Sequence, residues 1–262
     1  MRKLGPACVA ALFSVVQFAG AESNSAPENA NVVAADGSTK LHWAVYHDQA
    51  GVVLDLLAAG ANADAANRYG ITPLLLACEN GNAEIVKALL EAGADANQER
   101  EGGESALMVA ARTGRPEAVQ VLLSGGAKVD AQDRTGQTAL MWAAAEGHAE
   151  VVDLLLGKRA DVKHRLKSGF TALLFAAREG KAEAVRVLLK AGVDANDAII
   201  TERKSGGRAA GQGTSALHFA VENGHFELAM QLVEAGADPG DARTGYTPLH
   251  TLTWVRKPDR GD

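Results

Sequence analysis

A segment of 33 residues recurs along this chain, and the recurrence constrains the fold more than any other feature of the sequence. Successive copies begin with a threonine or serine, at Thr39, Thr72, Ser105, Thr138 and Thr171, with a constant step of 33 residues. Ser215 and Thr247 begin two further copies, after steps of 44 and 32 residues. A unit of this length cannot bury its own apolar face, so the copies must stack on one another as a solenoid.

Each copy predicts a helix, a glycine turn, a second helix and an extended finger, as residues 136–168 show. Thr138 can cap a first helix whose inward residues are spaced by three and four, and Gly147 ends it. The second helix carries Glu150 in its first turn, followed by a valine- and leucine-rich face. Neither helix is long enough to be stable alone, so the copies depend on their neighbours.

Several short motifs carry a family resemblance. They are Thr72-Pro73-Leu74, Thr247-Pro248-Leu249-His250, Ser215-Ala216-Leu217-His218, the turn from Glu146 to Val152, and Glu91-Ala92-Gly93-Ala94-Asp95. Over residues 36–252 the chain resembles ankyrin repeats, and more closely the exported bacterial proteins built from many of them. The resemblance implies an all-α ankyrin-repeat solenoid with β-hairpin fingers, about six full repeats and a partial seventh.

The N-terminal residues predict export. Arg2 and Lys3 precede an apolar run over residues 7–18, and small residues follow at 19–21. This pattern is typical of a secretory signal peptide, here residues 1–21, and predicts a periplasmic or secreted protein. The alternative is an uncleaved anchor, for which the apolar run is short, and no other stretch approaches a membrane span. The polar residues 22–35 predict a flexible lead-in to the array at 36–252.

Charge and cysteine content narrow the classes of partner and of chemistry. Removal of residues 1–21 takes away two positive charges and no negative ones, which moves the net charge from −6 to −8. A chain of this charge is not expected to bind nucleic acid through its overall field. Cleavage also removes Cys8 and leaves Cys78, so no internal disulfide can form. Cys78 aligns with small inward residues, which predicts a buried structural thiol.

Three departures from the repeat stand out. Arg159 replaces the glycine that follows the second helix, where a left-handed backbone would be strained by about 1 kcal/mol, so repeat four is a predicted soft point. Residues 198–213 are a Gly-rich, basic insertion, either a surface loop without function or a loop that closes over a bound molecule. Residues 253–262 are a degenerate cap or a truncated terminal segment.

The sequence carries no recognisable catalytic or metal motif. There is no His-Glu-x-x-His, no cysteine pair and no nucleophile elbow. His42, His218 and His250 follow the leucine of the repeat signature, where the resemblance implies a bond to the backbone of a neighbouring turn. We therefore expect no enzyme activity and no cofactor or metal in this chain. The resemblance also places one helix position between adjacent helix pairs, which favours core packing over a ligand site for Trp43, Leu76, Val109, Trp142, Phe175 and Phe219.

The resemblance assigns recognition to the finger tips and to the outward positions of the first helix. The candidate residues on this surface are Tyr46, Arg68, Tyr69, Arg112, Arg134, Phe170, Arg178 and Tyr246. Basic residues at the finger tips, with aromatic residues beside them, suit a protein partner with an acidic or mixed surface. The alternative is a solvated face on which the arginines pair with Glu146 and Glu179.

The most specific expectation concerns two equivalent arginines. Arg112 and Arg178 lie two repeats apart with Ala145 between them, and they are expected to flank a gap that takes an acidic or amide side chain, with an apolar group resting on Phe170. The function expected is therefore that of a monomeric, non-catalytic scaffold that binds another protein through its concave groove. The alternatives are a regulatory or targeting segment of a larger enzyme beyond Asp262, and a structural spacer.

Overall fold

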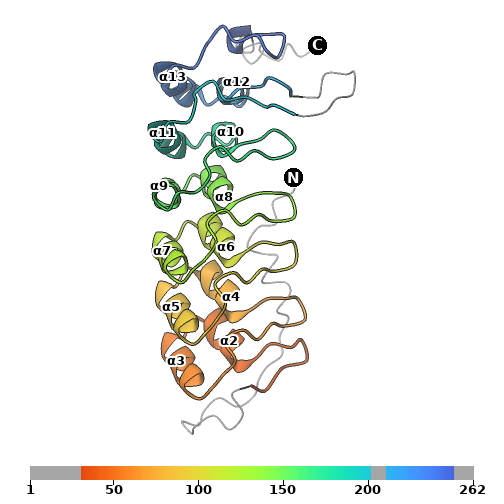
Figure 1. Ribbon diagram of the computed structural model, residues 1–262, viewed down its shortest axis with the longest axis vertical. Helices are drawn as coiled ribbons and strands as arrows, with labels where there is room; N and C mark the ends of the chain where they lie inside the picture. The colour runs from red at the N-terminus through yellow and green to blue at the C-terminus, as the bar shows by residue number, and fades with distance from the viewer. Residues whose placement is uncertain (1–30, 202–210, 251–262) are drawn as a thin grey trace, which may run out of the picture.

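The computed structural model describes residues 31–201 and 211–250 as an elongated stack of helix pairs (Figure 1). Finger loops project from one side, and the helices next to them form an inner layer. The inner layer consists of α2 (Lys40–Tyr46), α4 (Pro73–Asn80), α6 (Ala106–Thr113), α8 (Ala139–Glu146), α10 (Ala172–Arg178) and α12 (Ala216–Glu222). The outer layer consists of α3 (Ala50–Ala58), α5 (Ala83–Glu91), α7 (Pro116–Ser124), α9 (Ala149–Gly157), α11 (Ala182–Lys190) and α13 (Phe226–Glu234). The predicted all-α solenoid is confirmed.

Each inner helix begins at the threonine or serine that marks its repeat. The Oγ1 of Thr138, for example, accepts a hydrogen bond from the Met141 N–H at 3.4 Å. Gly147 ends the same helix in a left-handed conformation, with φ of 85°. The side-chain cap therefore sets the start of the inner helices, and a left-handed glycine sets the end of α4, α6 and α8.

The core lies between the two layers and is filled by alanine, valine and leucine. Ala143, Val152 and Leu155 have no exposed surface, and neither does Cys78. Burial raises the pKa of the Cys78 thiol far above its ordinary value, so the predicted structural thiol is confirmed. Of the aromatic residues at the shared helix position, Phe175 lies in this core, and Trp142 and Phe219 pack against it and keep part of their surface exposed.

The fingers are turns without extended strands in the described ranges, so the predicted β-hairpins are reduced to isolated β-bridges, and these occur at only some of the fingers. One such bridge joins Glu99 to Ser105. Successive tips also touch through the backbone, because the Arg134 N–H donates to the Gly102 carbonyl at 2.9 Å. The fingers therefore stack on one another as the helices do.

Several predicted segments lie outside the described residues: the signal peptide at 1–21, most of the lead-in, the middle of the insertion and the terminal segment at 253–262. The last residues before the array do contact the first repeat, because the Asn31 Oδ1 accepts from the Asn62 N–H at 2.8 Å. The two ends of the insertion prolong a finger, since the Ile199 N–H donates to the Thr214 carbonyl at 2.9 Å.

Arg159 adopts the left-handed backbone that the repeat predicts for a glycine. Its φ is 65°, and the other non-glycine residue with positive φ in the described ranges is Asp48, at 56°. Aspartate tolerates this conformation better than most residues, because its short side chain can hydrogen-bond to the local backbone. The long side chain of arginine has no such compensation. Repeat four therefore holds a strained residue at the end of α9.

Candidate protein-binding groove

The inner helices and the fingers meet along one face, which we call the groove face. One residue in the last turn of each inner helix lies on it: Tyr46, Glu79, Arg112, Ala145, Arg178 and Glu222. We call these six residues the groove row. Side chains of the row contact the finger that precedes the same helix or follows it, so the row faces the fingers.

Arg112 is held by carboxylates of its own chain. Its Nε lies 3.2 Å from the Glu104 Oε1, and its Nη2 lies 3.8 Å from the Glu79 Oε1. Glu104 also pairs with Arg100, and its side chain is 13% exposed. The expected alternative partners were Glu146 and Glu179, but the carboxylates that hold Arg112 come from its finger and from the preceding repeat. The Arg112 guanidinium is therefore already engaged.

Arg178 has different surroundings at the equivalent position. Its guanidinium carbon lies 5.0 Å from the centre of the Phe170 ring and 5.2 Å from that of Phe175. Its Nη2 lies 3.0 Å from the Oε1 of Glu179, one of the two expected partners. Both side chains of this pair are substantially exposed, 35% for Arg178 and 42% for Glu179. The two rings thus orient a guanidinium whose carboxylate partner is a flexible surface group.

Phe170 is the centre of an aromatic cluster. Its ring centroid lies 4.9 Å from that of Phe175 and 5.4 Å from that of Phe219. We call these three residues with Arg178 the aromatic seat. Because Arg178 covers one side of Phe170, the ring is not the open apolar platform that the sequence suggested, and the exposed edge of the seat is the guanidinium itself.

Ala145 separates the two arginines and is the smallest member of the groove row. One helical turn before it, Trp142 is half-buried, and its Nε1 is inaccessible and has no hydrogen-bond partner within the described ranges. A buried donor without an acceptor costs about 1–3 kcal/mol and calls for an explanation. The floor between the arginines therefore combines a small side chain with an unsatisfied indole N–H.

Aromatic residues mark both ends of the groove face. Tyr46 meets the rings of Trp43 and His47 edge to face, with centroids 6.2 and 5.2 Å away. At the other end, the Tyr246 hydroxyl donates to the Glu222 Oε1 at 3.0 Å. Burial, together with this bond, raises the pKa of Tyr246 above its ordinary value.

The three remaining candidate residues lie on the fingers, apart from the groove row. Arg68 donates to the Ala35 carbonyl at 2.6 Å, and its guanidinium lies 5.7 Å from the Tyr69 ring centre. Arg134 is exposed at its tip. The structure therefore divides the candidate residues into a groove set, with Tyr46, Arg112, Phe170, Arg178 and Tyr246, and a tip set, with Arg68, Tyr69 and Arg134.

Two of the three histidines that the resemblance singled out, His42 and His218, bond to the backbone of a neighbouring turn as expected, whereas His250 contacts Thr247 of its own turn. The Nε2 of His42 lies 3.0 Å from the Ile71 carbonyl, and that of His218 lies 3.1 Å from the Tyr246 carbonyl. Within the described ranges, no three His, Cys, Asp or Glu side chains are grouped so as to hold a metal ion. Over the same residues, no helix combines the length and the apolarity needed to cross a bilayer.

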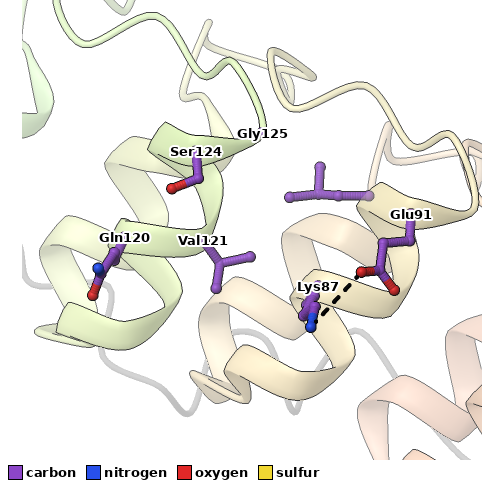
Figure 2. Close-up of a pocket in the computed structure, with 7 residues that line it drawn as sticks. Lys87, Glu91, Gln120, Val121, Ser124 and Gly125 are labelled. Carbon is purple, nitrogen blue, oxygen red and sulfur yellow. Dashed lines mark ion pairs between the residues drawn. The ribbon is translucent and has the colours of Figure 1, made fainter.

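A cleft that the sequence did not reveal lies on the outer layer between α5 and α7 (Figure 2). It encloses about 460 Å³ above Leu90 and Val121, and the Lys87–Glu91 ion pair, 3.8 Å long, lies at its rim. The glycine at position 125 is the one hint of this cleft in the sequence. A larger residue would crowd Leu90 there, because a Cβ on Gly125 would lie 2.9 Å from the Leu90 Cδ1. The helices α5 and α7 lie on the side of the inner layer away from the fingers (Figure 1). The polar side chains that line the cleft, Lys87, Glu91, Gln120 and Ser124, do not form a set suited to catalysis.

Profiles of known families decide the relationship. The profile for ankyrin repeats (3 copies) matches residues 8–100, 41–133 and 107–199, and that for a single ankyrin repeat matches residues 212–244. The chain belongs to the ankyrin repeat family. No curated protein matches it.

Two solved ankyrin repeat structures resemble the chain along most of its length. The ankyrin repeat domain of Bcl-3, a member of the IkappaB protein family, is 29% identical with a TM-score of 0.68, and the match covers 85% of this chain and 100% of that one. The human ASB11 ankyrin repeat domain is 25% identical with a TM-score of 0.71, covering 84% of this chain and 99% of that one. Ankyrin repeat domains of this kind generally mediate contacts between proteins.

Proposed function

We propose that this ankyrin repeat protein is a non-catalytic scaffold that binds another protein through its groove face, and that the aromatic seat anchors the partner. The observation that carries the proposal is the placement of Arg178 over Phe170 and Phe175. Stacking fixes the plane of the guanidinium, so less side-chain entropy is lost when a partner binds. Its pairing with exposed Glu179 is worth about 0–1 kcal/mol, which a partner carboxylate can replace.

The partner that fits this site presents an acidic side chain with an apolar group beside it. A carboxylate can accept two parallel hydrogen bonds from Arg178, as arginine–carboxylate pairs commonly do. The apolar group then covers Ala145 and Trp142, where no long side chain of the groove row stands in the way. Arg112 contributes little to this partner, because Glu104 and Glu79 already engage it.

Site-specific photo-crosslinking tests the proposal, because it captures a partner whose identity is not needed in advance. A photoreactive amino acid at Ala145 should crosslink a protein from an extract of the source cells, and the Arg178→Ala change should abolish the product. The control carries the same group at Asp153, which is exposed on α9 in the outer layer. Equal crosslinking from both positions, or crosslinking that survives Arg178→Ala, would contradict the proposal and favour a spacer or another surface.

The proposal includes export, which rests on the basic and apolar residues at the N-terminus. The mature protein should then begin at Glu22 and reach its partner in the periplasm or outside the cell. Intact-mass measurement of protein from the source cells checks this expectation. A mass that retains Met1 to Ala21 would overturn the export assignment and leave the groove proposal standing.

A further inference from the structure

The junction between repeats four and five lacks a contact that the other described junctions share. In the loop before an inner helix, an Asn or Asp side-chain oxygen accepts a hydrogen bond from a backbone N–H one repeat further on, and we call this contact the Asx bridge. The bridges are 2.8–2.9 Å long and use Asn31, Asp64, Asn97, Asp130 and Asn196. Lys163 occupies this position in repeat four, and its side chain has no oxygen to accept the bond.

A histidine contact that two other junctions have is absent here too, at the turn between the helices, as it is in repeat three, where Arg115 holds the equivalent position. Between repeats three and four, the His148 Nε2 lies 3.0 Å from the Arg112 carbonyl, and between repeats five and six, the His225 Nε2 lies 3.2 Å from the Arg178 carbonyl. Lys181 holds the equivalent position in repeat five. Its aliphatic chain lies over Gly147, where a Cβ would be 2.7 Å from the Lys181 Cδ. Over the described ranges, no hydrogen bond joins Lys181 to repeat four.

The chain is also strained beside this junction. Arg159 has a φ of 65° and follows α9, four residues before Lys163. A residue with a Cβ is disfavoured in this conformation, so the loop that should carry the bridge begins from a strained backbone. The missing Asx bridge and the strained residue therefore fall on one junction, whose turn also lacks the histidine contact.

An ion pair between successive fingers joins the two repeats instead, and no other two fingers in the described ranges are joined by an ion pair. The Arg165 Nη2 lies 2.5 Å from the Asp197 Oδ1, and its Nη1 donates to the Ala198 carbonyl at 2.8 Å. The Thr171 hydroxyl donates to the other carboxylate oxygen, also at 2.5 Å. No other repeat has a basic residue at the position of Arg165, where the equivalent residues are Ala66, Glu99, Gln132 and Ala198. We call the pair Arg165–Asp197 the latch.

We propose that the junction between repeats four and five is a joint at which the array opens, and that the latch controls the opening. The Asx bridges at the other junctions are hydrogen bonds to backbone N–H groups, whereas the latch depends on a partly buried ion pair, so a change in the charge of either partner acts on this junction alone. Leu155 and Leu188 are fully buried in the closed array. Because each repeat depends on its neighbours for part of this burial, the opening is local and partial and leaves both repeats folded.

The joint has a consequence for binding, and this step alone rests on the proposed function. Trp142 and Ala145 lie in repeat four, whereas Phe175 and Arg178 lie in repeat five. A partner that contacts both sets spans the joint and holds it closed. The latch thereby regulates how well the site is preorganised for the partner.

Hydrogen exchange measured by mass spectrometry on the free full-length chain tests the joint directly. Asp197→Asn removes the charge of the latch, and exchange should become severalfold faster in peptides covering residues 158–166 and 192–199. The matched control is Asp130→Asn, the same chemical change at the preceding junction, where an amide oxygen can still form the Asx bridge as Asn97 does. This control should exchange as the unmodified chain does. Salt at about 0.5 M should accelerate exchange in the same peptides of the unmodified chain by less than Asp197→Asn does, because the latch is partly buried.

A rescue variant completes the test. Lys163→Asn supplies the missing bridge, and in the Asp197→Asn background it should return exchange toward that of the unmodified chain. Unchanged exchange in Asp197→Asn, equal acceleration throughout the array, or failure of Lys163→Asn to restore protection would each overturn the proposal. None of these outcomes bears on partner binding through Arg178, because no partner is present.

Discussion

Arg112 and Arg178 occupy the same position of the inner helix two repeats apart, yet they have opposite surroundings. Eight residues before each arginine, the finger carries Glu104 in one case and Phe170 in the other. Glu104 forms an ion pair with the Arg112 guanidinium. Phe170 instead stacks against the Arg178 guanidinium and leaves the N–H edge of that group exposed. The comparison teaches that the repeat fixes where a side chain lies, while the residue that faces it from the finger decides what it can bind.

The largest effect is expected when the facing residues themselves are removed. Phe170→Ala should lower the free energy of unfolding by about 2 kcal/mol, because it opens a space between Phe175 and Phe219. Glu104→Ala, at the equivalent position, should cost about 1 kcal/mol at most, since a partly exposed ion pair contributes little. Denaturant unfolding of both variants checks the difference, and equal costs would show that the two sites are built alike.

Repeat four lies between the two arginines and contains the strained residue Arg159. Replacing this residue tests whether repeat four is less stable than its neighbours. Arg159→Gly should raise the free energy of unfolding by about 0.5–1 kcal/mol, because glycine adopts a φ of 65° without strain. The effect should be greatest in repeats three to five, since each repeat contacts only its neighbours. An unchanged or lower denaturation midpoint would mean that the surrounding loop has adapted to arginine.

Acid should act at the first repeat, outside both arginine sites. Burial lowers the pKa of His42, so its charged form is disfavoured in the folded chain while the unfolded chain takes up a proton at the ordinary value of 6.5. Stability is therefore present above that pH and is lost as the pH falls below it. Protonation also removes the Nδ1 acceptor of the Thr39 N–H, now at 3.1 Å. His42→Asn should flatten the fall in unfolding midpoint between about pH 7 and pH 5; an equal fall in both chains would contradict the assignment.

Much of this molecule could be predicted from the sequence because the repeat aligns each residue with equivalents of known role. The helix caps, the burial of Cys78 and the left-handed backbone of Arg159 all follow from such positions. The engagement of Arg112 was missed, although a signal existed in the finger residue eight places earlier, where glutamate stands in for phenylalanine. The latch required the structure, because its partners lie in successive fingers and occur once.

The pair of arginines gives the most direct test of the account. Arg178→Ala and Arg112→Ala should be titrated in parallel against the protein captured at Ala145, with the fold of each variant checked by circular dichroism. We expect Arg178→Ala to weaken binding by about 1–3 kcal/mol and Arg112→Ala by less than about 0.5 kcal/mol. Equal losses in two folded variants, or full affinity in Arg178→Ala, would contradict the claim that the aromatic seat anchors the partner.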